Sequence, residues 1–422
     1  MEWQIPESER TYLRELARKQ AEYAALPVMA QRRQMWYDLN DSRPSARPPV
    51  VIETWTFDRD FMPTGILHCT SELGRGIEWQ LLRHVRNHEL LDDDKVIPDT
   101  FDTGWHVTID ELGVKIGRES CKDAQGYEAG YQFIHPIKDL KRDFPLLRPA
   151  VCSVDREATM QRKAFLEDLF AGLLRVRLVS GIMGCTSLTQ RVIQLMGMEA
   201  FFTAMYDQPD DVHQLMAYLR DNALRVMRWA EAEGLLRLNN EAVDSCASSG
   251  NLTTRLPAPG YKEGAARLCD MWGGAESQET VGISPEMFHD FCFPYYRAVC
   301  EPMGLLYWGC CEPADPFWND IRQFPHLKKV SISRWCNQKI IGEAMRGTPL
   351  VFSRKPDPGF LGVDVKLNEA AWAAHVRETL EATRGAYVEF IVRDVYTVHG
   401  DLGKPRRAVE VARREIDRHW RP

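Results

Sequence analysis

The chain has 422 residues, of which 44% are hydrophobic and 27% charged, values typical of a soluble globular protein with ample material for a core. The net charge of −7, with acidic and basic residues interspersed, provides no broad basic surface and argues against a nucleic-acid partner. No apolar run approaches the roughly 20 residues that a membrane-spanning helix needs, so we expect no membrane contact.

The first residues lack the basic and apolar regions of a secretory signal, so we expect a cytoplasmic protein. In that compartment the 11 cysteines are expected to be reduced, and none of them forms a CxxC pair. We therefore interpret them as packing residues, metal ligands or nucleophiles.

The N-terminal region has an amphipathic helical pattern, which the proline-containing segment 42–48 interrupts before an apolar stretch begins. We predict an N-terminal helical arm over residues 1–48 and a second region over 49–422. Within the latter, at about 96–140, short β-like runs alternate with Gly, Asp and Pro and predict a small β insertion.

From about residue 150 onward, strand-like and helix-like segments alternate as in a parallel sheet covered by helices. Helices are predicted from Pro209 to Gly234, from the N-cap Ser284 to a break at Pro294, and from Asn368 to Gly385. The predicted strands are 51–54, 95–98, 176–182, 235–239, 305–308, 329–332, 350–352 and 387–392. Eight β/α units predict an α/β fold of the (β/α)8 TIM-barrel type. A doubly wound open sheet is the alternative, although the chain has no GxGxxG motif to support it.

In such a barrel, the residues that follow the strands meet at one mouth. Here they are Glu241, Asp244, Cys310, Cys311, Glu312, Arg334, Trp335, Cys336, Arg354, Lys355 and His399. The adjacent Cys310 and Cys311, followed by Glu312, are the first place to expect a reaction centre. Paired thiols at a strand end suit zinc, which takes thiolate, imidazole and carboxylate ligands. The alternative is that both cysteines are small buried hydrophobic residues.

Other polar residues extend this candidate site. Arg354 and Lys355 follow strand seven, where barrels frequently bind phosphate, and could clamp a carboxylate or phosphate; a surface ion pair is the alternative. His399 follows strand eight and is a candidate ligand or general acid, with a structural role as the alternative. The long connection 246–282 predicts a functional loop rather than a surface excursion. It contains Asp270, Trp272, Glu276, Gln278 and Glu279.

The order of four motifs resembles the uroporphyrinogen decarboxylase superfamily. The motifs are 195–212 (LMGMEAFFTAMYDQPDDV), 278–288 (QETVGISPEMF), 293–296 (FPYY) and His399-Gly400. The resemblance covers roughly residues 145–420 and implies a (β/α)8 barrel independently of the strand count. The superfamily contains cofactor-free porphyrinogen decarboxylases and zinc-dependent methyltransferases that pass a methyl group between a corrinoid and another carrier or donor.

Two departures from the family patterns bear on the expected reaction. The decarboxylases have an Arg-Gln-Ala-Gly-Arg motif at strand one, where this chain has Ile-Glu-Thr-Trp-Thr-Phe at 52–57, so porphyrinogen decarboxylation is not expected. The methyltransferases have a His-x-Cys zinc motif after strand five. Trp308-Gly309-Cys310 occupies that place, matching the cysteine but not the histidine. The family's last zinc cysteine lies near the position of His399.

The resemblance implies a corrinoid-linked methyltransferase that transfers a methyl group from a small methoxylated or methylamine-type substrate to a corrinoid protein, or from it to a thiol. The implied partners are a separate corrinoid protein and, by analogy, a second copy in a homodimer. One alternative is a metal-independent decarboxylase of a small acid, using Arg354, Lys355 and Asp270; another is a barrel that only binds a tetrapyrrole or corrinoid. The predicted metal ligands are Cys310, Cys311 and His399, the predicted catalytic residues Glu312, Asp270 and Glu241, and the predicted substrate-binding residues Trp272, Gln278, Glu279, Trp308, Arg334, Arg354 and Lys355.

Overall fold

The computed structural model describes residues 3–124, 126, 128–182, 185–243, 245 and 248–421. Asp244 and Cys246 therefore lie outside the described residues. The main sheet has seven strands in the order β1, β13, β12, β11, β10, β9, β8, and every neighbouring pair is parallel. These strands are β1 (Val50–Ile52), β8 (Cys185–Thr186), β9 (Trp272–Ala275), β10 (Leu305–Trp308), β11 (Leu327–Ile332), β12 (Val351–Arg354) and β13 (Tyr387–Val392).

The sheet is parallel, as predicted, but it is not closed. Among the described residues no backbone ladder joins β1 to β8, so the predicted closed (β/α)8 barrel is not confirmed. The doubly wound alternative does not fit either, because the strands follow one another in chain order and the last strand pairs with the first. A doubly wound sheet requires a reversal of that order.

Three smaller strand pairs accompany the main sheet. A parallel pair is formed by β2 (Thr100–Gly104) and β7 (Arg175–Val179). One antiparallel pair joins β3 (His106–Asp110) to β6 (Val151–Asp155), and the other is a hairpin of β4 (Gly117–Lys122) and β5 (Glu128–Ile134). Strands β2 to β5 lie within the segment in which the sequence predicts a β insertion.

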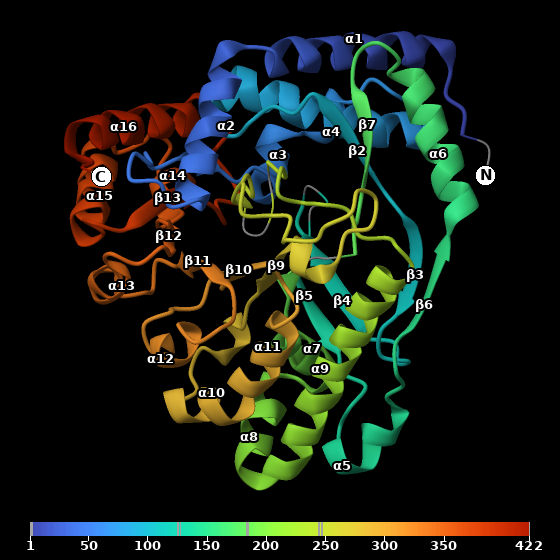
Figure 1. Ribbon diagram of the computed structural model, residues 1–422, viewed down its shortest axis with the longest axis vertical. Helices are drawn as coiled ribbons and strands as arrows, with labels where there is room; N and C mark the ends of the chain where they lie inside the picture. The colour runs from blue at the N-terminus through green and yellow to red at the C-terminus, as the bar shows by residue number, and fades with distance from the viewer. Residues whose placement is uncertain are drawn as a thin grey trace.

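Helices surround the sheet, with α1 and α2 along one side of the molecule and α8 to α11 on the opposite side (Figure 1). None of the described helices combines the length and apolar composition of a membrane span. The longer helices are α1 (Glu7–Ala24), α2 (Pro27–Asn40), α4 (Glu72–Arg86), α6 (Arg156–Leu169), α7 (Leu188–Met196), α8 (Met198–Asp207), α9 (Pro209–Ala232), α10 (Pro285–Phe291), α11 (Phe293–Cys300), α13 (Gln338–Met345), α15 (Glu369–Ala382) and α16 (Gly403–His419). The short ones are α3 (Asp58–Phe61), α5 (Leu140–Asp143), α12 (Trp318–Ile321) and α14 (Gly359–Gly362).

The helix ends follow the capping chemistry of the sequence. The Ser284 side chain accepts a hydrogen bond from the Met287 amide at the start of α10, and Asn368 accepts one from Ala371 at the start of α15. Helix α10 ends before Pro294, as predicted. Residues 1–48 contain α1 and α2, which agrees with a helical N-terminal region.

Strand prediction was less complete than helix prediction. Strands β10 and β13 have the predicted bounds, but the predicted strands 95–98 and 235–239 are not β-strands in the structure. In 235–239 side chains replace ladder partners: the Arg237 amide donates to Ser180 Oγ at 2.7 Å, and Asn239 Oδ1 accepts from the Trp272 amide at 2.9 Å. Conversely, β9 lies in the connection 246–282, which the sequence predicts to be a functional loop.

A buried ion pair lies inside the main sheet and joins β11 to β13, the two strands that flank β12. Lys329 Nζ on β11 is 3.0 Å from Glu389 Oε2 on β13, and both side chains are fully buried. Lys329 also donates to Ser249 Oγ at 2.6 Å, while Ser353 on β12 donates to Glu389 Oε1 at 2.5 Å. These bonds offset the cost of removing the two charges from water.

Replacing Lys329 by Met should destabilise the protein by about 3–5 kcal/mol, because Glu389 would lose a paired cation in a buried environment. The change is measurable as the free energy of urea unfolding. The exposed Lys339→Met variant should stay within about 0.5 kcal/mol of wild type. Equal stability of the two variants would show that the ion pair contributes nothing, whereas Lys329→Met combined with Glu389→Leu should recover part of the loss.

Candidate functional site

Two adjacent thiols lie at the carboxyl end of β10. The Cys310 and Cys311 sulfur atoms are 3.6 Å apart, and both residues are partly exposed. Gly309 turns the chain out of the strand with a φ of +93°, a conformation that disfavours other residues. Space is also restricted there, because a Cβ on Gly309 would lie 3.1 Å from Ser331 Cβ. The sequence therefore places the thiols at the sheet end through a glycine turn.

The thiols contact two charged residues that follow β13, and one of these also lies near Glu53 after β1. Arg393 Nη1 donates to Cys310 Sγ and Cys311 Sγ donates to Asp394 Oδ2, each at 3.5 Å. Arg393 Nε lies 3.3 Å from Asp394 Oδ2 and 3.6 Å from Glu53 Oε2. We call these five residues the thiol cluster: Glu53, Cys310, Cys311, Arg393 and Asp394. Sequence reasoning missed the two residues after β13, although their position directly after a predicted strand was a usable signal.

The electrostatics of the thiol cluster reflect its burial. The hydrogen bond with Cys310, followed by burial, raises the pKa of the Cys311 thiol. Burial also raises the pKa of Glu53, although the nearby Arg393 guanidinium opposes this shift. Burial alone would lower the pKa of Arg393, but the negative charges around it, first among them Glu53, raise it above its ordinary value. Arg393 is therefore a permanent cation beside the thiols.

Glu312, predicted as catalytic, holds the thiol turn in place. It is 2% exposed; its Oε1 accepts from the Ser277 amide and its Oε2 from the Cys310 amide, each at 2.9 Å. Because both carboxylate oxygens bind backbone amides, the side chain ties the turn after β10 to the segment after β9. In this structure Glu312 positions Cys310 rather than facing open space.

Glu276 and Glu279 follow β9 and lie near Glu312. Glu279 Oε2 accepts from Thr189 Oγ1 at 2.8 Å, and Glu276 Oε2 accepts from the Gln278 amide at 3.0 Å. Burial, together with repulsion from Glu312 and Glu279, raises the pKa of Glu276 to about 7. Glu276 can therefore gain or lose a proton near neutral pH. Glu276 lies in the predicted functional loop, where the sequence predicts no particular role for it.

Arg354 and Lys355, predicted as one clamp, point to opposite faces of the sheet because side chains alternate along a strand. Arg354 Nη1 donates to the Ser333 carbonyl at 2.8 Å. Lys355 Nζ instead points inward and donates to Ser353 Oγ at 2.9 Å. Burial lowers the pKa of Lys355 to about 7, against the attraction of Glu389. Only Lys355 of this pair faces the interior near the thiol cluster.

Three other predicted residues have structural contacts. Asp270 precedes β9 and is therefore at the amino end of that strand, where its Oδ2 lies 2.9 Å from Arg267 Nε. Trp272, the first residue of β9, donates from Nε1 to the Asn251 carbonyl at 2.9 Å. Trp308 is buried and stacks on Phe324 with ring centroids 4.2 Å apart. These side chains are not brought together with the thiols.

The remaining predicted residues are more exposed. Arg334 pairs with Asp357 at 2.7 Å, and Glu241 is exposed. His399 is also exposed, and its Nε2 lies 3.1 Å from the Gly362 carbonyl. Gln278 begins a short 3-10 helix next to Glu279, beside Glu276.

The predicted zinc ligands are only partly assembled. The sulfur separation of 3.6 Å is close to the roughly 3.8 Å between two sulfurs on one tetrahedral zinc. However, no group of three or more His, Cys, Asp or Glu residues suited to a metal occurs in the described part of the chain. His399 makes a different contact, and the Arg393 cation already lies against Cys310. The predicted set of Cys310, Cys311 and His399 therefore does not fit zinc as it stands.

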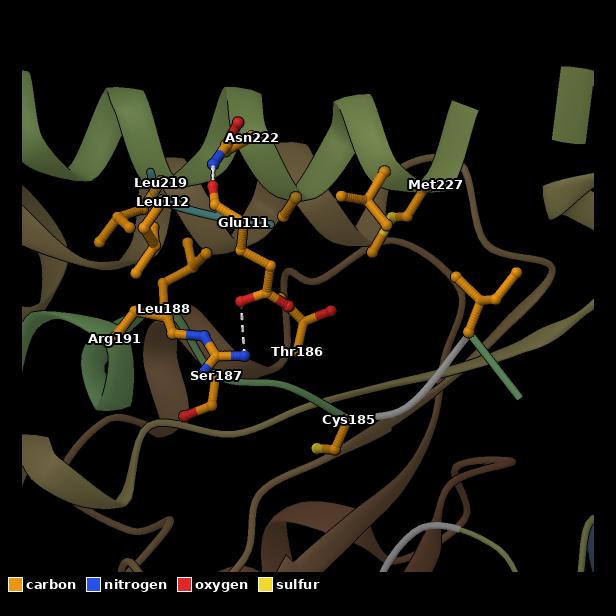
Figure 2. A pocket seen from close by; sticks show the side chains of 13 residues that line it. Glu111, Leu112, Cys185, Thr186, Ser187, Leu188, Arg191, Leu219, Asn222 and Met227 are labelled. Atoms are coloured by element: carbon orange, nitrogen blue, oxygen red, sulfur yellow. Dashed lines mark hydrogen bonds and ion pairs between the residues drawn. The ribbon is translucent and has the colours of Figure 1, made fainter. Parts of the chain in front are cut away.

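Two cavities lie near these groups. One, of about 600 Å³, is lined by Arg334, Asp357, Phe360 and Asp394, and so borders the thiol cluster directly through Asp394. The other, of about 140 Å³, lies between α7 and α9. Figure 2 shows the Glu111 and Arg191 side chains paired at its wall, with Ser187 beside them and Met227 across the space. Of the two cavities, the larger one is lined by a residue of the thiol cluster.

Comparisons with known proteins identify a similar fold but no family. No family model and no curated protein matches the sequence, so membership of the uroporphyrinogen decarboxylase superfamily is not confirmed. The structure is similar to that of a methyltransferase from Methanosarcina mazei, with a TM-score of 0.51 and 12% sequence identity. The match covers 92% of this chain and 98% of the other. At this identity, the likeness shows that the two proteins share a fold.

Glu276→Gln should change how stability depends on pH. The folded state of the wild type keeps Glu276 protonated up to about pH 7, whereas the unfolded chain releases that proton near pH 4.5. Wild-type stability should therefore fall relative to the variant as pH rises between these values, by up to about 3 kcal/mol. Urea unfolding at several pH values measures this difference.

The exposed Glu263→Gln serves as the matched control and should follow the wild-type pH profile. If Glu276→Gln and wild type kept a constant stability difference from pH 4.5 to pH 8, Glu276 would titrate as an ordinary carboxyl group and the assignment would be wrong.

Proposed function

We propose that this protein is a methyltransferase that moves a methyl group from a small methoxylated or methylamine-type substrate to a corrinoid on a partner protein, or from that corrinoid to a thiol. The observation that carries the proposal is the thiol cluster, in which Cys310 and Cys311 meet Arg393 and Asp394 at the carboxyl end of a parallel sheet. The shared fold with a methyltransferase over 92% of the chain supports it. Ligand sites of parallel α/β folds lie at this end.

We also propose that the sheet belongs to a barrel completed by non-ladder contacts. On one side, the Ile52 amide donates to Asp93 Oδ2 at 2.8 Å and Lys95 Nζ donates to the Ile52 carbonyl at 3.0 Å. On the other side, the segment 235–239 is bonded to Ser180 beyond β7 and to the first residue of β9. These bonds support a ring that passes through the β2–β7 pair.

The residues around the thiols suit demethylation of a small molecule. The substrate would enter through the cavity beside Asp394 and place its methyl-bearing atom near the sulfur pair. When the methyl group leaves, the oxygen or nitrogen that carried it needs a proton. Lys355 lies inside the same end of the sheet with a pKa near 7, which makes it a candidate proton donor at neutral pH.

Zinc remains part of the proposal, with Cys310 and Cys311 as its sulfur ligands. When bound, zinc would act as a Lewis acid on the methyl-bearing group or on a thiol. The third protein ligand of zinc is not assigned, because the predicted His399 contacts the Gly362 carbonyl instead. A cytoplasmic location, the corrinoid protein as partner and a homodimer remain proposals of the same kind.

A metal-independent decarboxylase is the second candidate, and a specific observation favours it. Lys355 and Glu276 both have pKa values near 7, and either could protonate a carbanion after loss of carbon dioxide. In such a decarboxylase, Lys355 and Arg393 would bind the substrate carboxylate. Arg354 and Asp270, initially expected to take part, make their contacts elsewhere.

Cys310→Ala and Cys311→Ala should each reduce methyl transfer to cob(I)alamin by at least about 100-fold, because each removes a sulfur that touches the reacting group or its metal. The assay uses methoxylated and methylated amine donors and follows the corrinoid spectrum. Elemental analysis of the same samples should find about one zinc per chain in wild type and less in both variants.

Cys121→Ala is the matched control, since Cys121 is an exposed cysteine on the β4–β5 hairpin. It should retain wild-type activity and metal content. The proposal would be wrong if the wild-type protein bound no zinc after reconstitution under reducing conditions and transferred no methyl group. Release of carbon dioxide from a small acid by the same protein would then favour the decarboxylase.

A further inference from the structure

We propose that Cys310 and Cys311 form a site of reversible oxidation, at which a peroxide converts the two thiols into a disulfide between neighbouring residues. The two sulfur atoms are already 3.6 Å apart, so forming the bond requires only a small local movement. Both residues are partly exposed, which leaves them accessible to a small oxidant. The proposal concerns the chemistry of the pair itself and goes beyond any role in methyl transfer.

The surroundings favour attack by one particular sulfur. Arg393 Nη1 donates to Cys310 Sγ at 3.5 Å, which places a cation beside that sulfur. Cys311 instead donates its proton toward Asp394 Oδ2. Cys310 is therefore the sulfur that attacks, and Cys311 is the one that resolves the product.

The reaction balances with the peroxide as the only co-reactant. The Cys310 sulfur attacks one peroxide oxygen, the O–O bond breaks, and a sulfenic acid and one water form. The Cys311 sulfur then attacks the Cys310 sulfur, so that the S–S bond forms, the S–O bond breaks and a second water leaves. Two electrons pass from the two thiols to the peroxide.

The backbone allows this disulfide but strains it. Adjacent Cα atoms are about 3.8 Å apart, which is shorter than the usual range of roughly 4.4–6.8 Å for disulfide-linked residues. A strained disulfide is more easily reduced, and labile disulfides of this kind are the regulatory ones. Residues 310–312 lie outside the helices and strands, directly after Gly309, so the movement that closes the disulfide need not break a strand ladder.

The oxidised pair would change the site that surrounds it. Pulling Cys311 Sγ toward Cys310 removes its bond to Asp394, which borders the larger cavity. Neither sulfur would then be available as a thiolate. Loss of methyl transfer on oxidation is a consequence that rests on the proposed function, whereas formation of the disulfide does not.

The test is peptide mass spectrometry of the full-length protein after treatment with hydrogen peroxide. Cleavage after Arg297 and Arg322 releases a peptide that contains Cys300, Cys310 and Cys311. We expect alkylation under denaturing conditions to label all three cysteines in the untreated protein, but only Cys300 after peroxide. The peptide should also be lighter by two hydrogens, and dithiothreitol should restore both thiols.

Single variants separate this outcome from general oxidation. In Cys310→Ser and Cys311→Ser the remaining thiol has no neighbour, so the peptide should not lose hydrogens and should take up oxygen on longer exposure. Cys300→Ser should behave as wild type. The proposal is overturned if both thiols stay alkylatable at a peroxide concentration that oxidises the exposed Cys121, or if the disulfide joins Cys300. Because none of these readouts uses activity, they stand whether or not the protein transfers methyl groups.

Discussion

The charge balance inside the sheet is the constraint on which the rest of the structure depends. Glu389 is fully buried on β13, and a buried carboxylate is tolerated only when cations and hydrogen-bond donors surround it. Lys329 from β11 and Ser353 from β12 supply these partners, so three consecutive strands of the sheet must keep one register. Lys355 extends the same network toward the carboxyl end. A slip of one residue would turn these polar side chains toward the helices.

Fixing that register also fixes the candidate site. Because the strands are parallel, their carboxyl ends meet at one edge, and residues far apart in sequence become neighbours there. Glu53 follows β1, the thiols follow β10, and Arg393 and Asp394 follow β13. The turn that presents the thiols is itself held by Glu312, which accepts hydrogen bonds from one amide after β9 and one after β10. The same strand ends thus fix the register of the sheet and position the thiol cluster.

Two kinds of group are gathered at this edge, and they suit different tasks. The thiols offer soft, nucleophilic atoms beside a permanent guanidinium charge. Glu276 and Lys355, whose pKa values both lie near 7, offer protons. The proposed demethylation would use both, since the thiols would hold zinc beside the methyl-bearing group while the leaving oxygen or nitrogen takes a proton. An acid decarboxylase needs chiefly the second kind, which is why the cysteine variants separate the two proposals.

The sequence alone determined what depends on local chemistry. Caps and apolar spacing located α9, α10 and α15, and the apolar runs located β10 and β13, because such elements are specified by residues a few positions apart. The adjacent thiols were also visible in the sequence. Only the tertiary structure decided that β9 is a strand despite its glycines and that side-chain hydrogen bonds, not a β-ladder, join 235–239 to its neighbours. It also decided that Arg393 and Asp394 complete the thiol cluster, while His399 lies elsewhere. These features depend on contacts between residues tens to hundreds of positions apart, which no local pattern records.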